Sequence, residues 1–345
     1  MISKHSEGNR GGRTVTRMAI SIEPPMRTTI ITLAGAMPSS VTITLDVLTY
    51  ANRLCTQAGR PAPFELRLFG SGAADFAPFV EQAADSSLPP ELVLVPAQGL
   101  SKAPSLAKRL QDPDVEDARR EIIRGADAGA DIASSCTGTL LLASTGLLDE
   151  RRATTAWWLA PLCRELFPRV RLDTRELVLA DRRFTTAGAA MAQMDLMVLI
   201  VARHAGSAIA DRCARIMVLD ERRSQAPYMA IGLLAAGDEK VARAAAWARA
   251  ALEGGTSVNE IAAAVGVSPR TFARRVQRST GLSPVRFLQR VRLERAVELI
   301  ETTRLPVEEV ARQVGYAEPS TLRGLIRRTY GAGPRELRSR SARGR

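Results

Sequence analysis

The sequence predicts two folded regions in one chain: a doubly wound α/β domain with a parallel sheet, followed by an all-α domain with two helix-turn-helix units. Three observations predict this. Residues 28–205 alternate short apolar segments with amphipathic ones, the last hundred residues contain one passage twice, and most of the excess positive charge lies in that last part. At 345 residues the chain is long enough for two or three domains, each with its own core.

The first region has the element pattern of a parallel sheet covered by helices on both faces, as in flavodoxin-like folds. The expected strands are Thr29–Leu33, Phe64–Phe69, Glu91–Val95, Asp131–Ser135 and Glu176–Ala180, with shorter pieces at Ala153–Thr155 and Arg183–Thr186. The expected helices are Leu45–Ala58, Val115–Ala128, Thr137–Leu147, Trp158–Phe167 and Ala190–His204. Ligands of such sheets bind beyond the carboxyl ends of the strands.

The repeat in the last hundred residues is a copy of a whole folding unit. Residues 258–266 match residues 307–315 at an offset of 49, and Phe272 matches Leu322 at an offset of 50. A similarity that keeps its register across a one-residue insertion indicates two copies of one unit. Each copy starts with a short amphipathic helix and a glycine turn and then enters a second helix, which is the layout of a helix-turn-helix.

Capping signals place the second helix of each copy, which we call the reading helix. In the first copy Ser268 and Pro269 supply an N-cap and a first-turn proline, and Gly281 ends the helix. Phe272 and Val276 point inward, so the arginines between them occupy the other faces. The remaining expected helices are Glu239–Glu253, the connecting helix Pro284–Thr303 and the second reading helix Glu318–Tyr330.

Four blocks of this region, residues 268–275, 281–284, 292–296 and 310–316, closely resemble the AraC/XylS family of bacterial transcription regulators. The resemblance implies binding to double-stranded DNA, RNA polymerase as a partner, a homodimer and most often activation. The DNA-binding residues that it implies are Arg270, Thr271, Arg274, Arg275, Arg278, Ser320, Thr321, Arg323 and Arg327. Where the second copy would carry the family's usual arginine it has Gly324, so we expect the first unit to dominate sequence specificity.

The distribution of charge supports this interpretation over a plain helical bundle with an accidental repeat. Lys and Arg number 48 against 36 Asp and Glu, a net charge of +12. Residues 237–345 hold 21 against 11, residues 1–27 hold 5 against 2, and residues 28–236 hold 22 against 23. The positive excess therefore lies in the region where DNA phosphates need to be neutralised.

Composition bounds the remaining possibilities. No apolar run approaches the roughly 18 residues of a membrane span, and the first residues lack the apolar core of a signal peptide. The four cysteines lie far apart without metal-type spacing, so we expect a cytoplasmic protein with neither metal nor cofactor. The expected parts are a disordered basic arm over 1–27 (with Met18 and Met26 as alternative starts), a sensor domain over 28–222, a linker over 223–238, a DNA-binding domain over 239–338 and a basic tail over 339–345.

One constellation in the α/β region marks a sharp turn from strand to helix. Residues 131–135 form the strand and residues 136–140 open the helix, whose first N–H groups are free to face a ligand. Together with stretches within 141–155 and at 187–188, this elbow closely resembles the PfpI-type domain of the class I glutamine-amidotransferase-like superfamily. It is similar to the variant fused to AraC-type modules in the GlxA group, which implies a domain that senses a small molecule, often a nitrogenous metabolite.

The role of the elbow cysteine, Cys136, depends on its partners. A cysteine nucleophile needs a nearby base, usually His, and an oriented acid. Catalytic relatives commonly carry His directly after the cysteine, where this chain has Thr137, and Glu after the first strand, where this chain has Ser40. Its two histidines are His5 in the arm and His204 at a helix end. We therefore predict a binding domain and not an enzyme; the alternative is a PfpI-like cysteine-dependent hydrolase or lyase with a DNA-binding appendage.

The predicted ligand-binding residues surround this elbow. They are Ser40, Cys136, Thr137, Gly138 and Trp157. Two assignments stay open at this point: Trp157 and Trp158 either stack on a ligand or pack in the core, and Asp195 either pairs with a cation or caps a helix, with a role in ligand recognition as the alternative.

Overall fold

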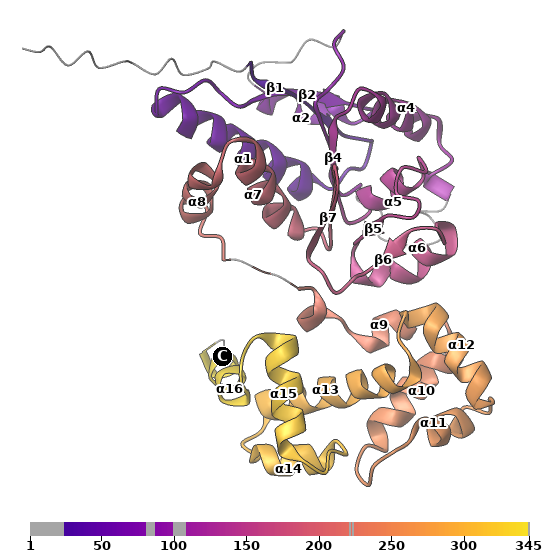
Figure 1. Cartoon of the computed structure of the whole chain (residues 1–345). Helices are drawn as coiled ribbons and strands as arrows, with labels where there is room; N and C mark the ends of the chain where they lie inside the picture. The colour runs from indigo at the N-terminus through magenta and orange to yellow at the C-terminus, as the bar shows by residue number, and fades with distance from the viewer. Residues whose placement is uncertain (1–23, 81–86, 99–107, 221, 223, 344–345) are drawn as a thin grey trace, which may run out of the picture.

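The computed structural model describes residues 24–80, 87–98, 108–220, 222 and 224–343, and within them the chain folds into two parts (Figure 1). An α/β domain precedes an all-helical domain, as the sequence predicts. The expected arm over 1–27 lies mostly outside the described residues. Its last two residues, Met26 and Arg27, already belong to the first strand.

The sheet of the α/β domain has six strands in the order β2-β1-β3-β4-β8-β7. All neighbouring strands pair in parallel except β7 and β8, which are antiparallel. The strands are β1 (Met26–Ile31), β2 (Phe64–Phe69), β3 (Leu92–Val95), β4 (Asp131–Ser135), β7 (Val178–Asp181) and β8 (Phe184–Ala187). The predicted parallel sheet is therefore confirmed, with an antiparallel strand added at one edge.

Helices cover both faces of this sheet (Figure 1). One face carries α1 (Pro38–Gln57), α7 (Ala192–His204) and α8 (Ser207–Ile216), and the other carries α4 (Pro113–Asp127), α5 (Gly138–Ala143) and α6 (Ala160–Leu166). Along β3, Leu92 and Leu94 face the first core while Val93 and Val95 face the second, so the strand is buried on both sides. The shorter elements are α2 (Ala73–Phe76), η1 (Ala77–Phe79), β5 (Arg152–Ala153), η2 (Trp157–Leu159) and β6 (Arg171–Leu172).

The helical domain packs both repeated units on one continuous core. Its helices are α9 (Ile231–Ala235), α10 (Glu239–Ala250), α11 (Val258–Ala264), α12 (Pro269–Thr280), α13 (Pro284–Thr302), α14 (Val307–Gln313), α15 (Pro319–Tyr330) and α16 (Pro334–Arg343). Both reading helices, α12 and α15, lie within one residue of the positions predicted for them. The long helix α13 joins the two units, as expected.

Two expectations about organisation need correction. The predicted linker contains η3 (Ala226–Tyr228) and the helix α9, whose Ile231 and Leu234 are buried in the core of the helical domain. The predicted basic tail continues the last helix, α16, as far as Arg343. One further helix, α8, lies outside the set expected from the sequence, and it buries Ile209 and Cys213 in the core of the α/β domain.

Candidate DNA interface and the cysteine elbow

The first reading helix, α12, begins and ends at the residues that its caps dictate. The Ser268 hydroxyl accepts a hydrogen bond from the Thr271 amide at 3.2 Å, and Gly281 adopts a left-handed conformation with φ of 72° at the other end. Phe272 and Val276 are fully buried. The remaining faces of α12 are therefore the ones that can meet a partner outside the domain.

Three arginines form an exposed stripe along α12. Arg270, Arg274 and Arg278 are four residues apart, which is about 40° of helix rotation per step, and all three are exposed. Their side chains make no ion pair or hydrogen bond with any described residue. Arg275 differs, because it donates two hydrogen bonds to the Asp238 carboxylate, at 3.0 and 2.8 Å. Thr271 is also less available, since its hydroxyl accepts a bond from Ser268 at 3.0 Å.

The second reading helix, α15, presents fewer free cations. Ser320, Thr321 and Arg327 are exposed and make no side-chain hydrogen bond within the described chain. Arg323 forms an ion pair with Glu308 of α14. A side chain at Gly324 would meet open space, so nothing in the fold requires a glycine there. The structure thus places all nine predicted DNA contacts on the reading helices but leaves only some of them unpaired.

The cysteine elbow has the sharp turn that the sequence predicts, and its backbone is strained. Cys136, between β4 and α5, has φ of 51°, a conformation that is costly for a residue with a side chain. Its amide donates to the Ala187 carbonyl at 3.1 Å, and its carbonyl accepts from the Thr155 hydroxyl at 2.6 Å. Strand pairing on one side and this hydroxyl on the other hold the turn in place.

The surroundings of Cys136 favour the neutral thiol. Burial raises the pKa of Cys136 to about 11, although the Thr137 and Ala190 amides act in the opposite direction. No described histidine or carboxylate contributes to that shift. His204 lies within 3.2 Å of the Asp131 carboxylate, at the opposite end of β4 and roughly 16 Å away by strand rise.

The predicted ligand residues hold the protein's own backbone. The Ser40 hydroxyl accepts from the Ala97 amide at 3.0 Å, and the Thr137 hydroxyl accepts from the Gln98 amide at 2.6 Å. A side chain at Gly138 would collide with the carbonyls of residues 95 and 96. The segment that follows β3 therefore fills the space above the elbow as far as it is described, and residues 99–107 lie outside the described residues.

The prediction that Trp157 binds the ligand needs correction. Its side chain is 5% exposed and packs with the core of the helical domain, while its edge meets Trp158 with 5.3 Å between ring centroids. Trp158 is 42% exposed. Trp157 therefore ties the two domains together, which the sequence could not show because the contact joins distant segments.

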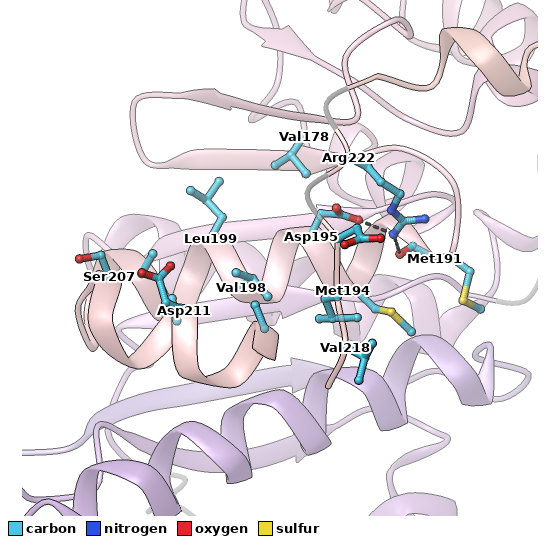
Figure 2. Close-up of a pocket in the computed structure, with 15 residues that line it drawn as sticks. Val178, Met191, Met194, Asp195, Val198, Leu199, Ser207, Asp211, Val218 and Arg222 are labelled. Carbon is cyan, nitrogen blue, oxygen red and sulfur yellow. Dashed lines mark hydrogen bonds and ion pairs between the residues drawn. The ribbon is translucent and has the colours of Figure 1, made fainter. Parts of the chain in front are cut away.

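A cavity of about 720 Å³ lies elsewhere, between α7, α8 and the chain that follows α8 (Figure 2). Apolar side chains such as Met194, Val198 and Leu199 line its centre. Asp195 and Arg222 form an ion pair at one end, and burial raises the pKa of Asp195. The expectation that Asp195 is paired is confirmed, but the cavity was missed because α8 was not predicted.

The chain between the domains is anchored by Gln225, which sequence reasoning also missed. Its side-chain amide donates to the carbonyls of Thr155, Thr174 and Glu176 at 3.0–3.2 Å, and its oxygen accepts from the Ala189 amide at 3.1 Å. A side chain at Gly188 would overlap the Gln225 amide. Gln225 is 1% exposed, so this socket fixes the connecting segment beside the cysteine elbow.

Two absences hold for the described part of the chain. It contains no group of three or more His, Cys, Asp or Glu side chains that could hold a metal ion. None of its helices is both long and apolar enough to cross a membrane.

Comparison with known proteins decides what the helical domain is. Residues 261–340 match the family model of a helix-turn-helix domain. That stretch includes both reading helices and the helix that joins them. This chain contains a helix-turn-helix domain. Its architecture of two repeated units on one core is the one that the internal repeat predicts.

Relatives with the same kind of domain extend the similarity into the α/β region. The transcriptional regulator GbdR of Pseudomonas aeruginosa is 29% identical over 213 residues, 61% of this chain and 58% of that protein. The regulator GlxA of Rhizobium meliloti is 27% identical over 216 residues, 62% of this chain and 66% of that protein. These alignments are longer than the helical domain, so they reach into the α/β domain. The predicted resemblance to GlxA-type regulators is confirmed.

One solved structure is similar to part of this chain. The crystal structure of an AraC family transcriptional regulator from Pseudomonas putida matches with a TM-score of 0.41 and 22% identity, over 56% of this chain and 100% of that one. The chain spans 58% of the length of GbdR, so the activity of the whole protein is taken up as a proposal below.

Proposed function

We propose that this protein is a sequence-specific DNA-binding transcription regulator whose α/β domain senses a small molecule. The observation that carries the proposal is the exposed stripe of Arg270, Arg274 and Arg278 on the first helix-turn-helix reading helix. Unpaired guanidinium groups on an exposed helix face suit the phosphates and guanine edges of a major groove. The partners would be double-stranded DNA and, through it, RNA polymerase.

The positions of the exposed cations support different tasks for them. Arg270 and Arg274 lie in the first half of α12, which helix-turn-helix proteins direct at base edges. Arg278 and Arg327 lie nearer the ends of their helices and suit phosphate contacts. Ser320 and Thr321 are short donors that read bases permissively. The first unit would therefore supply most of the specificity, and activation by a homodimer stays a prediction.

The cavity between α7 and α8 supports the sensing role. Its volume of about 720 Å³ falls in the range of small-molecule sites, and its wall is apolar with a few polar groups. Arg222, which pairs with Asp195 at its rim, lies three residues before the anchored Gln225. A ligand that displaced Arg222 would thus act directly on the chain between the domains. The Cys136 elbow is the alternative site for the effector, although the described part of the segment after β3 occupies the space above it.

DNA binding is tested by selecting duplexes from a random library with the purified full-length protein. We expect an enriched operator, bound more tightly than random DNA of equal length at the same salt concentration. Substitution of Arg270 and Arg274 by alanine should reduce the preference for the operator over random DNA. Equal affinity for operator and random DNA in the wild-type protein would refute the proposal.

The sensing site is tested by a thermal-shift screen of amino acids, amines and betaines, because a ligand of the folded state raises its apparent stability. Leu199→Trp would fill the α7–α8 cavity, and Cys136→Ser would alter the elbow. Ile123→Trp on α4 is the matched control, since Ile123 is 36% exposed and lies on the opposite face of the sheet. If only Cys136→Ser changes the response, the effector binds at the elbow and not in the cavity.

The strained backbone at Cys136 is the one observation that favours an enzyme instead. With a pKa of about 11, the thiol would be ionised to about one part in a thousand at pH 8, and ionisation would rise as the pH approaches 11. We therefore expect slow alkylation of Cys136 by iodoacetamide at pH 8 and no turnover of glyoxals, amides or peptides. Turnover that disappears in Cys136→Ser would establish the hydrolase or lyase alternative.

A further inference from the structure

The carboxy-terminal end of the first reading helix meets the α/β domain. Helix α12 packs against α6, where the two domains meet (Figure 1). The guanidinium of Arg164, from α6, lies beside Gly281. A side chain at Gly281 would overlap that guanidinium. Glycine is therefore favoured at position 281 for two reasons. Its backbone is left-handed, and the Arg164 guanidinium occupies the space that a side chain would need.

The charge of Arg164 is poorly compensated. Its Nη1 atom is buried and has no hydrogen-bond partner in the described chain, and burial lowers the pKa of the guanidinium. Asp173 attracts it from a distance, but that carboxylate accepts two hydrogen bonds from Arg175, at 3.0 and 2.7 Å. The end of α12 supplies only a partial negative charge, equivalent to about half a unit. A partly buried cation without a full partner is unfavourable, so this position suits an anion.

A cavity opens beside this guanidinium, between the two domains. Its volume is about 420 Å³, and its wall consists of Pro161, Arg164, Glu165, Gln277 and Arg278. Arg278 is exposed and makes no ion pair or hydrogen bond with any described residue. Two cations from different domains therefore face one space, opposed by a single carboxylate. A second cavity of about 540 Å³ shares Pro161, Glu165 and Arg278, and Trp158 lines it.

We propose that this junction binds a small oxyanion, the phosphate or carboxylate group of a metabolite, between Arg164 and Arg278. Each guanidinium is a planar fork that can bind an oxyanion through two parallel hydrogen bonds. The Gln277 amide offers a further donor from the same wall. Glu165 opposes the anion and keeps the affinity moderate.

The bound anion would act on DNA binding through Arg278. An oxyanion held by Arg278 and Arg164 competes with a DNA phosphate for the same guanidinium and fastens α12 to α6. This second step rests on the proposed function, whereas binding of the anion does not. Losing one phosphate contact should lower the slope of log affinity against log salt by about 0.9.

Isothermal calorimetry on the full-length protein tests the site, with inorganic phosphate and succinate as separate probes and chloride holding the ionic strength constant. We expect saturable binding of at least one probe to the wild-type protein. Arg164→Met and Arg278→Gln should each weaken it about tenfold or more, because each removes a charged fork. Glu165→Gln is the matched control on the same wall, and it should tighten binding several-fold because it removes the repelling carboxylate.

Stability measurements separate this effect from general salt effects. Phosphate at high concentration stabilises most proteins by exclusion from their surface, so the midpoint of thermal unfolding is compared below about 10 mM. Arg164→Met keeps a side chain of similar length and should fold. If it does not, Arg278→Gln, at an exposed position, still decides the matter. No saturable binding by wild-type protein, or equal affinity in wild type and Arg278→Gln, would overturn the site.

Measurements of DNA binding distinguish the anion proposal from the proposed function. With operator present, the bound probe should reduce the affinity of the wild-type protein more than equal ionic strength of chloride does, and Arg164→Met should abolish that extra loss. Anion binding without loss of DNA affinity would overturn the competition. Failure to bind DNA in buffer free of oxyanions would contradict the proposed function instead.

Discussion

The two reading helices, α12 and α15, have the same helix ends and buried positions but different exposed residues. Both start with a proline, both end at a glycine with φ near 70°, and both bury their apolar residues in one core. The matched position that carries Arg274 in α12 carries Gly324 in α15. Packing has thus kept the architecture of the repeat while the exposed residues have diverged. A repeat in sequence does not imply a repeat in function.

The ends of the helices differ as well. Ser268 caps α12 with a side-chain hydrogen bond, and Ser257 forms a reciprocal capping box with Glu260 at the start of α11. Neither Glu318 before α15 nor Pro306 before α14 makes a side-chain cap. The first unit is therefore the better defined locally, and its reading helix packs against α6 of the α/β domain. The second unit depends more on its packing against α13.

The largest expected effect concerns what the two units share. Phe272 is fully buried and meets Phe287 edge to face, with 6.0 Å between ring centroids, so Phe272→Ala should lower the free energy of unfolding by about 3–5 kcal/mol. Leu322→Ala in the second unit should cost about 2–5 kcal/mol. Because one core joins both units, chemical denaturation should show one transition for the helical domain in both variants. Separate transitions for the two units would contradict the conclusion that they share one core.

The next effect concerns specificity. Arg274→Ala should weaken operator binding by about 1–3 kcal/mol and reduce discrimination against random DNA. Arg327→Ala, the comparison from α15, should weaken binding to all sequences alike and flatten the salt dependence. Titrations of both DNA types at several salt concentrations measure this. An equal loss on operator and random DNA for Arg274→Ala would remove the asymmetry between the units.

The caps give a smaller difference. Ser268→Ala removes the bond to the Thr271 amide and should destabilise the helical domain by about 1 kcal/mol. Glu318→Ala removes no cap bond and should stay within about 0.5 kcal/mol of wild type. Denaturant midpoints of the two variants are compared at one pH. A loss in Glu318→Ala as large as that in Ser268→Ala would mean that the second helix is capped after all.

The smallest expected effect comes from substitutions of Gly324, which would make the two reading helices more alike. Gly324→Ala should raise stability by up to about 1 kcal/mol, because glycine is a poor helix former and the added side chain meets open space. Gly324→Arg should add a similar helix gain together with a cation for DNA. Scanning operator base pairs with both variants separates the two contributions. If Gly324→Arg leaves the second half-site as permissive as Gly324→Ala does, position 324 does not face the bases.

Local signals explain what could be predicted from the sequence. The Ser268–Pro269 cap and the terminal Gly281 act within one helical turn, which is why both ends of α12 were predicted to the residue. The strands β2 and β4 also have the bounds that the sequence predicts, because turns flank short apolar runs. The sharp turn at Cys136 followed from the strand-to-helix junction. Each of these depends on neighbours in the sequence.

Long-range contacts explain what could not be predicted. The hydroxyls of Ser40 and Thr137 hold the chain after β3, a partner about 40 to 60 residues away, so no local pattern indicates that this segment occupies the space above the elbow. Gln225 reaches carbonyls up to 70 residues away, and its polar side chain looks like an ordinary linker residue. Arg164 lies over Gly281 only because two domains meet. Contacts between distant segments place these side chains, and such contacts leave no periodic pattern in the sequence.

The Gln225 socket has a consequence for how far the two domains can part. Gln225 is anchored in the α/β domain and Met229 is buried in the helical core, so the chain between them reaches about 14 Å at full extension. A Gln225 side chain pulled from its socket therefore faces that socket at an effective concentration of about millimolar or above. Dilution cannot open such a junction. Only something that binds the open arrangement, or destabilises the closed one, can change the separation.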